Sequence, residues 1–227
     1  MAEQETKPSG RKQRHVTWKH ELWYHVCWSF CWLPLKVLFR VRHRGARHVP
    51  KKGPVLVVSN HQSFLDPPAI GVGLWRRMNY LARKQLFTFK PFALLIASVD
   101  AIPLDQDGIG FQGIKETIRR LRNNEMVLIF PEGSRSFDGN MVPFRKGYIN
   151  IAVKTGAVIV PTAIAGAFQA FPRQKKYPSI FKKGLTVEYG APITPDDYRD
   201  MKEEELHDLV ESRVKEIFER INKRYVK

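Results

Sequence analysis

Short apolar runs alternate with amphipathic stretches through most of the chain, from residue 53 onward. Runs of four to eight apolar or β-branched residues are typical of buried strands, and apolar residues three or four positions apart are typical of helices. Strands are predicted over residues 54–60, 78–82, 101–104, 126–130, 157–163 and 185–189. Helices are predicted over residues 67–77, 91–98, 111–123, 147–155 and 195–226. Because the two kinds of element alternate, we expect an α/β fold with a mainly parallel central sheet flanked by helices.

The chain before residue 49 has a different pattern. Residues 1–15 are polar and basic, and we expect a disordered tail there. Residues 22–39 are the most apolar stretch and are rich in tryptophan, which favours the membrane interface. A spanning helix needs about 20 apolar residues, and Pro34 interrupts this stretch. We therefore expect residues 16–48 to form a membrane-associated helical segment, kinked near Pro34, ahead of a catalytic domain over residues 49–227.

Two other interpretations of this N-terminal segment stay open on the sequence alone. One is an amphipathic helix that packs on its own domain, and the other is a single membrane span. The basic residues on both sides of the apolar stretch suit a position among lipid headgroups in either of the membrane interpretations.

The charge of the chain favours a membrane as partner. The formal net charge is +16 and the sequence pI is about 10.0, so the surface attracts polyanions. No zinc-finger, basic-zipper or RNA-binding pattern is present, so anionic lipid headgroups are expected as partners and nucleic acid is not. Cys27 and Cys31 provide neither a disulfide framework nor a zinc-ligand set, which favours a reducing compartment. The predicted location is the cytoplasmic face of a membrane.

A histidine and an aspartate follow the first predicted strand of the catalytic domain. The apolar run Val55–Val58 leads into Asn60, His61 and Ser63, and Asp66 lies five positions after the histidine. Histidine titrates near neutral pH and can take a proton from a hydroxyl, and a carboxylate can hold its ring and stabilise the charged form. The alternative is a surface histidine beside a helix N-cap aspartate.

A second polar cluster follows the predicted strand 126–130. It contains Pro131, Glu132, Gly133, Ser134 and Arg135. Arginine suits a phosphate or a carboxylate, and glycine lets the backbone approach a ligand closely. Ligands of open α/β sheets bind where the carboxyl ends of the parallel strands meet, so both clusters are expected at one edge. The alternative is a Glu132–Arg135 pair on an ordinary turn.

Together, the two clusters resemble motifs of the glycerolipid acyltransferase family, whose best-known members acylate 1-acylglycerol 3-phosphate. That family has Asn-His-x4-Asp early, here Asn60 to Asp66, and Phe-Pro-Glu-Gly-Ser/Thr-Arg-Ser later, here Phe130 to Ser136. Ala101–Asp105 is similar to its second block, and Val158–Pro161 to its fourth, a strand ending in proline. The resemblance covers about residues 50–195 and implies a glycerol-3-phosphate-acyltransferase-like fold.

One position departs from the family pattern. The second block usually ends Asp-Arg, and that arginine is associated with the acceptor's phosphate, whereas Gln106 follows Asp105 here. Other cations match basic positions that the family often has. They are Arg83, Lys84, Arg145 and Lys146. Each of these is open to the alternative of an ordinary solvated surface charge.

The resemblance implies a reaction and a set of site residues. The reaction is acyl transfer from acyl-CoA or acyl-carrier protein to the free hydroxyl of 1-acylglycerol 3-phosphate, which gives phosphatidic acid in phospholipid biosynthesis. His61 is expected to be the base, with Asp66 holding its ring, and neither a metal nor a bound cofactor is expected. Residues expected to bind substrate are Arg83, Lys84, Glu132, Gly133, Ser134, Arg135 and Lys146. Residues expected to support the site are Asn60, Ser63, Pro131 and Pro161.

Two alternative functions stay open at this point. Because Gln106 replaces the usual arginine, the acceptor could be another lysolipid or an acylated amino-acid lipid. The other alternative is a non-catalytic basic protein that binds membranes or nucleic acid. The basic segment 171–183 is either a solvated loop or a contact for lipid headgroups or an acidic acyl carrier.

Overall fold

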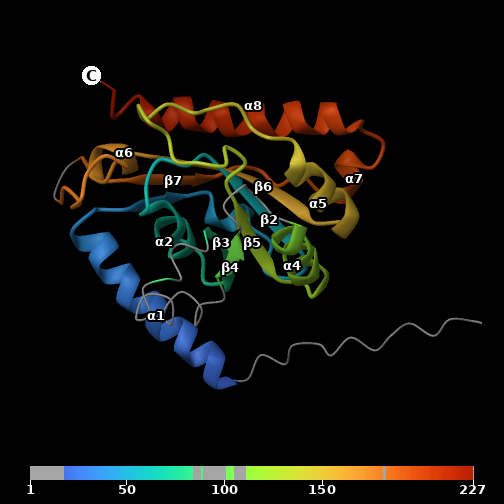
Figure 1. Cartoon of the computed structure of the whole chain (residues 1–227), viewed down its shortest axis with the longest axis horizontal. Helices are drawn as coiled ribbons and strands as arrows, with labels where there is room; N and C mark the ends of the chain where they lie inside the picture. The colour runs from blue at the N-terminus through green and yellow to red at the C-terminus, as the bar shows by residue number, and fades with distance from the viewer. Residues whose placement is uncertain (1–17, 84–87, 89–100, 105–110, 181–182, 227) are drawn as a thin grey trace, which may run out of the picture.

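A computed structural model of the chain describes residues 18–83, 88, 101–104, 111–180 and 183–226 (Figure 1). The predicted tail 1–15 and helix 91–98 lie outside the described residues, as do Lys84 and Gln106. Arg83 ends a described strand, and its side chain lies outside the description.

The described strands form one seven-stranded sheet in the order β1-β7-β6-β2-β5-β3-β4. Their bounds are β1 Arg42–Arg44, β2 Val55–Ser59, β3 Met78–Arg83, β4 Ile102–Leu104, β5 Met126–Ile129, β6 Val158–Ala165 and β7 Thr186–Tyr189. Every neighbouring pair is parallel except β6 and β7, which are antiparallel. The predicted mainly parallel sheet is therefore confirmed.

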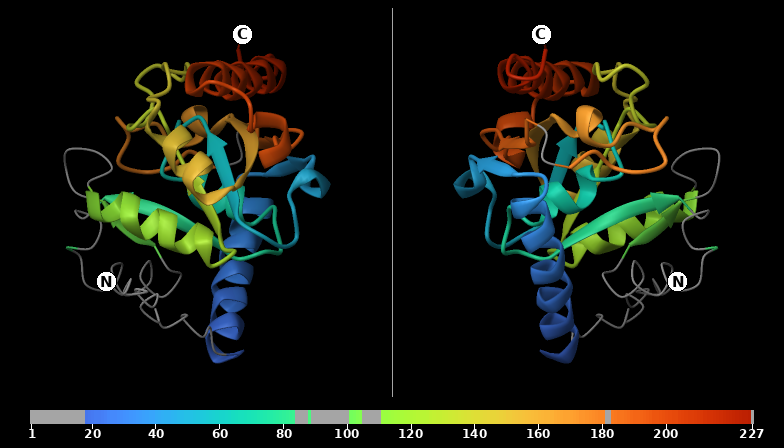
Figure 2. Two further views of the ribbon diagram at one scale, coloured as in Figure 1. Left: turned by 90° about the vertical axis from the view of Figure 1, so that its right-hand side faces the viewer. Right: turned by 90° about the vertical axis from the view of Figure 1, so that its left-hand side faces the viewer.

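The helices cover the sheet in two layers. Their bounds are α1 Trp18–Val37, α2 Asp66–Gly71, α4 Phe111–Arg122, α5 Gly147–Thr155, α6 Ala167–Ala170, α7 Pro195–Tyr198 and α8 Glu203–Asn222, with a 3-10 turn at Ala46–His48. Figures 1 and 2 show α8 and α5 on one side of the sheet and α1 on the other, with one end of α1 extending away from the body. The molecule is a three-layer sandwich.

The central strands are apolar at nearly every position because both of their faces are covered. Along β2, Val55 and Val57 pack in the cluster that contains α1 and α2, whereas Leu56 and Val58 pack in the cluster that contains α5 and α8. Side chains alternate between the faces of a strand, so a strand covered on both sides needs apolar residues at every position.

Three predicted elements differ from the structure. The segment Arg42–Arg44, expected within the membrane-associated segment, is the edge strand β1 and pairs with β7. Its charged sequence has no strand pattern, and only the pairing makes it a strand. Helix α2 ends at Gly71 rather than residue 77, and a Cβ at Gly71 or Gly73 would collide with packed side chains. The predicted helix 195–226 is two helices, α7 and α8. Lys202, the N-cap of α8, has an extended backbone that interrupts the helix, and its N–H donates to the Glu205 carboxylate.

Among the described residues, contacts along one face hold helix α1 against the domain. Trp28 Nε1 donates to the carbonyl of Leu74 over 3.1 Å, Met78 N donates to the Tyr24 hydroxyl over 3.2 Å, and Leu35 lies in the core. The opposite face exposes large apolar side chains, of which Phe30 is 80% accessible. No described helix combines the length and the hydropathy that crossing a bilayer requires.

The connections that follow β2 and β5 leave the same end of the sheet toward opposite faces. These two strands are parallel neighbours. β2 continues into α2 on the α1 side of the sheet, whereas β5 leads to α5 on the opposite side. In open α/β sheets, ligands bind at the carboxyl ends of strands where the connections diverge in this way. Both polar clusters of the sequence lie at this point.

Candidate active site

His61 and Asp66 meet at the carboxyl end of β2. The His61 Nδ1 atom lies 2.7 Å from Asp66 Oδ2, with the His61 side chain 18% exposed and that of Asp66 fully buried. A carboxylate only accepts hydrogen bonds, so Nδ1 carries the hydrogen of this bond. The other ring nitrogen, Nε2, is then the one with a lone pair to accept a proton.

Asp66 also closes the loop that carries His61, which we call the histidine loop (residues 60–66). Its Oδ2 atom accepts hydrogen bonds from the backbone N–H groups of Gln62 and Ser63, over 2.5 and 2.7 Å. These donors precede the aspartate in the chain, and Asp66 is itself the first residue of α2. The alternative of a helix N-cap aspartate beside an unrelated histidine is therefore wrong.

The second polar cluster, the arginine loop (residues 130–136), fixes the backbone of His61 from both sides. His61 N donates to Glu132 Oε1 over 3.0 Å, and Ser136 N donates to the His61 carbonyl over 2.8 Å. The Phe130 ring stacks on the imidazole at 4.0 Å between centroids. The two loops thus hold the peptide and the ring of one histidine.

Glu132 does not have the position expected of a substrate-binding residue. It is 5% exposed and lies beneath the histidine loop, where the His61 N–H needs an acceptor. Burial raises the pKa of Glu132 from 4.5 to about 8, and the nearby Asp66 adds to the rise, while the hydrogen bond from His61 opposes it. In the structure Glu132 supports the histidine loop, and its expected role in substrate binding stays a prediction.

Arg135 lies at the outer side of the site. Its guanidinium carbon is 3.5 Å from the centroid of the Phe64 ring, so it joins the arginine loop to the histidine loop. Gly133 has a φ of +73°, and a Cβ added there would lie 3.1 Å from the Arg145 guanidinium carbon. Ser134, which is half-buried, lies between Gly133 and Arg135 in the chain. The arginine loop therefore lies close to the Arg145 side chain and, through Arg135, contacts the histidine loop.

Lys146, also expected to bind substrate, is directed elsewhere. Its Nζ lies 3.6 Å from Glu204 Oε1, and both side chains are exposed. Lys146 immediately precedes α5, which packs beside α8, and the first turn of α8 is acidic. The neighbouring acidic turn therefore attracts this charge, and Arg145 is the member of the pair that contacts the arginine loop.

Hydrogen bonds to neighbouring backbone groups hold three of the residues expected to support the site, Asn60, Ser63 and Pro131. Asn60 exchanges two hydrogen bonds with Ile164 of β6, over 3.0 and 2.9 Å. Ser63 Oγ donates to the Phe171 carbonyl over 2.7 Å, and the Pro131 carbonyl accepts from Arg145 N over 3.1 Å. These bonds anchor both loops to the sheet and to each other.

Pro161 differs from its expected place at the end of a strand. It lies inside β6, which continues to Ala165, and pairs with Val58 of β2. The antiparallel ladder with β7 begins only at Thr162. The missing N–H of the proline therefore falls outside that ladder, which is why the strand tolerates it.

A third loop contacts the site, although its sequence matches no motif of the family. Residues 171–174 follow β6 and α6 and contact both of the other loops through Phe171, Arg173 and Gln174. The sequence signals were their place after a predicted apolar strand and the basic composition of segment 171–183, neither of which indicated contact with these two loops.

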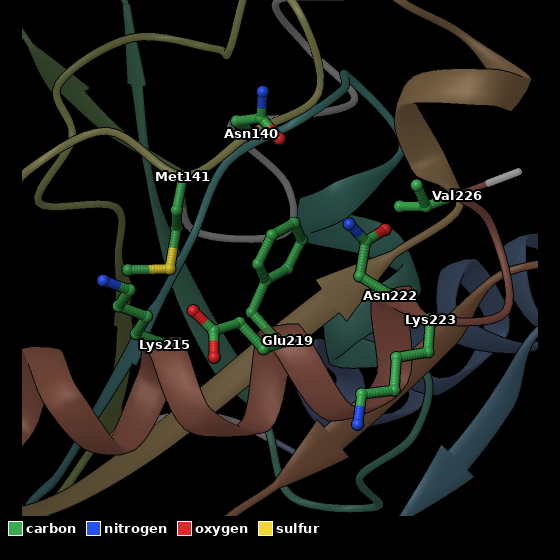
Figure 3. A pocket seen from close by; sticks show the side chains of 8 residues that line it. Asn140, Met141, Lys215, Glu219, Asn222, Lys223 and Val226 are labelled. Carbon is green, nitrogen blue, oxygen red and sulfur yellow. The ribbon is translucent and has the colours of Figure 1, made fainter.

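A cavity of about 430 Å³ lies apart from these residues. Figure 3 shows it between Asn140 and Met141 on one side and Lys215, Glu219 and Lys223 of the C-terminal region on the other. None of the site residues described above lines it. Among the described residues, no group of three or more His, Cys, Asp or Glu side chains could hold a metal ion.

A family model described as "Acyltransferase" matches residues 40–165, more than half of the 227 residues. This chain belongs to the acyltransferase family. Like other members, this acyltransferase is an enzyme that moves acyl groups, and it has the two motif loops within the matched region.

Named relatives agree with the assignment. This acyltransferase is 28% identical over 200 residues to the 1-acyl-sn-glycerol-3-phosphate acyltransferase of Bacillus subtilis, covering 84% of this chain and 96% of that protein. It is 29% identical over 186 residues to the human alpha enzyme of the same name, covering 78% and 66%. The crystal structure of the 1-acyl-sn-glycerophosphate acyltransferase PlsC from Thermotoga maritima matches with a TM-score of 0.72 and 28% identity, covering 92% and 80%.

Proposed function

We propose that this enzyme transfers an acyl group from a thioester to the free hydroxyl of 1-acylglycerol 3-phosphate, which yields phosphatidic acid in phospholipid biosynthesis. The observation that carries the proposal is the 2.7 Å bond between His61 Nδ1 and Asp66 Oδ2 at the carboxyl end of β2. The names of the Bacillus, human and Thermotoga relatives support the choice of acceptor.

The proposed mechanism is direct attack by the acceptor. His61 Nε2 takes the hydroxyl proton as the oxygen bonds to the thioester carbonyl carbon. Asp66 stabilises the imidazolium that forms. The tetrahedral intermediate then expels the thiolate, which recovers the proton from His61 as it becomes a thiol. The products are an ester and a free thiol, so no covalent acyl-enzyme is required. The donor is acyl-CoA or acyl-carrier protein.

The test is thioester cleavage by the purified chain with and without lysophosphatidate. We expect the acceptor to stimulate thiol release, and His61→Ala to lower the rate by about 10²–10⁴-fold or more, the usual contribution of a general base. Near-normal transfer by His61→Ala would remove the histidine from the mechanism.

A second candidate acceptor, a lysophospholipid without a phosphate monoester, is favoured by one position in the sequence. Gln106 follows Asp105 where the resemblance leads us to expect arginine. If another lysophospholipid stimulates thiol release and lysophosphatidate does not, the acceptor lacks the phosphate monoester and this second proposal replaces the first.

We also propose that the enzyme works at the cytoplasmic face of a membrane, with α1 docked among anionic headgroups. The exposed apolar face of α1 supports this, because lysolipid acceptors and diacyl products partition into bilayers. A docked enzyme need not extract either of them into water.

A further inference from the structure

Three parallel strands bring loops to the same edge of the sheet, and only two of these loops contain recognisable motifs. β5, β2 and β6 are adjacent and parallel, so their carboxyl ends lie together (Figure 1). The loop that follows β6 through α6, residues 171–174, is bonded to the other two. Ser63 Oγ donates to the Phe171 carbonyl over 2.7 Å, and Gln174 Nε2 donates to the Phe137 carbonyl over 2.7 Å.

Arg173 extends from this third loop across the arginine loop. Its Nη1 lies 3.4 Å from the Arg135 carbonyl, and its guanidinium carbon lies 3.8 Å from the centroid of the Phe137 ring. Arg135 lies over the Phe64 ring in the same way, at 3.5 Å. Two guanidinium groups on neighbouring segments therefore each lie over a phenyl ring.

Stacking prepares these groups for an oxyanion. A guanidinium that lies on a ring keeps its N–H donors in its own plane, where they reach carboxylate or phosphate oxygens. The ring also limits the rotamers of the side chain, so less entropy is lost when a ligand binds. The Arg173 side chain is exposed and that of Arg135 is partly exposed, so a ligand at this edge can reach both guanidinium groups.

The charge of Arg173 is not neutralised within the described part of the chain, where it forms no ion pair with a carboxylate. Asp138, the acid next to Phe137, is bonded to Ser136 and Asn140. A phosphate monoester carries about −1.5 to −2 charge at neutral pH, and it is bound best by more than one cation. The edge of the arginine loop therefore presents positive charge suited to such a group.

We propose that Arg173 is a specificity-determining residue that binds the acceptor's phosphate monoester together with Arg135. It would supply a cation in a chain that has Gln106 where the resemblance leads us to expect arginine. This inference rests on the proposed function, because it names the group of the acceptor that the third loop recognises.

The test compares Arg173→Gln and Arg173→Lys with Lys176→Gln. The control removes the same charge from an exposed site on the same segment, where Lys176 contacts only Tyr177 among the described residues. Hydrogen bonds to charged groups contribute about 1.5–3 kcal/mol, so Arg173→Gln should raise the acceptor KM by about 10–150-fold with kcat and donor KM little changed. Arg173→Lys should recover part of the loss, because lysine keeps the charge without the planar fork.

The assay is repeated with lysophosphatidylcholine, which lacks the monoester, and the loss should be confined to lysophosphatidate. An unchanged acceptor KM, an equal effect of Lys176→Gln, or a rise in the donor KM alone would overturn the assignment of Arg173.

Equilibrium binding of lysophosphatidate to the full chain separates this inference from the proposed function. Binding that depends on Arg173 without any turnover would uphold the phosphate site and reject the reaction. Normal turnover with binding indifferent to Arg173 would uphold the reaction and reject the phosphate site.

Discussion

At the residue scale, His61, the proposed base, has a hydrogen-bond partner among the described residues at every polar atom except Nε2. Its backbone N–H, its carbonyl and its Nδ1 each have a partner at 3.0 Å or less. Because these partners come from two separate loops, the position of Nε2 is determined by the packing of both. Precise placement of this kind is what makes general-base catalysis effective.

Asp66 should therefore contribute more to turnover than to binding. We expect Asp66→Asn to lower kcat by about 10²–10⁴-fold, because an amide favours the wrong imidazole tautomer and cannot stabilise the imidazolium. The acceptor KM should change little, and steady-state kinetics of a variant shown by circular dichroism to be folded provide the measurement. A rise in KM with kcat intact would mean that Asp66 serves binding.

Because of Glu132, the free energy of unfolding should fall as the pH rises from 4.5 toward about 8. Its pKa rises from 4.5 to about 8 on folding, so the folded state binds more protons than the unfolded state between these values. The stability that the neutral carboxyl provides is complete below pH 4.5 and is lost as the pH rises toward 8. Glu132→Gln keeps an acceptor for His61 N and cannot ionise.

Thermal unfolding of both proteins across pH tests this expectation. The melting temperature of Glu132→Gln relative to the parent should increase from pH 5 to pH 9, by an amount reflecting on the order of a few kcal/mol at most. If the melting temperatures of the two proteins changed in parallel with pH, the Glu132 carboxyl would have the same pKa in the folded and unfolded states.

At the element scale, helix α1 has two different faces, one packed on the domain and one exposed. Tyr24, Trp28 and Leu35 bind it to the domain, and Trp75, on the connection between α2 and β3, extends its aromatic surface. The Trp75 ring is stacked on His25 at 4.8 Å and meets Trp28 edge-on at 5.1 Å. One face therefore has a structural role, and the other remains apolar and exposed.

Membrane binding by the exposed face of α1 can be tested with a point substitution. The whole helix cannot be removed, because its inner face is part of the core. Phe30→Glu should weaken binding to anionic vesicles by about tenfold or more, since burying a large apolar side chain contributes about 1.5–3 kcal/mol. Val153→Glu, at an exposed apolar position on α5, is the matched control and should have a smaller effect. Vesicle co-sedimentation measures both, and equal losses would show that added negative charge alone explains the result.

At the scale of the whole molecule, the net charge of +16 should act alongside the apolar face of α1. Attraction between a basic surface and anionic lipid is screened by salt, and it contributes about 1 kcal/mol per basic residue near the surface. Binding to anionic vesicles should therefore fall by about tenfold or more as salt rises from about 50 to about 500 mM. Neutral phosphatidylcholine vesicles should show little salt dependence, and a similar fall there would exclude headgroup charge as the cause.

The sequence by itself determined the central strands and the place of the two polar clusters after them. Strands buried on both faces are apolar at nearly every position, so β2, β5 and β6 are visible as local patterns. The polar residues that follow β2 and β5 are equally local. The His61–Asp66 pair could be predicted because both residues belong to one short loop.

Only the tertiary structure decided which groups meet across the fold. Strand β1 is charged and exists because β7 lies beside it. Glu132 supports His61, Lys146 turns to Glu204, and Arg173 reaches the arginine loop because separate segments pack together. A sequence pattern reports how each residue is buried on its own element, whereas these partnerships depend on which elements the sheet places side by side.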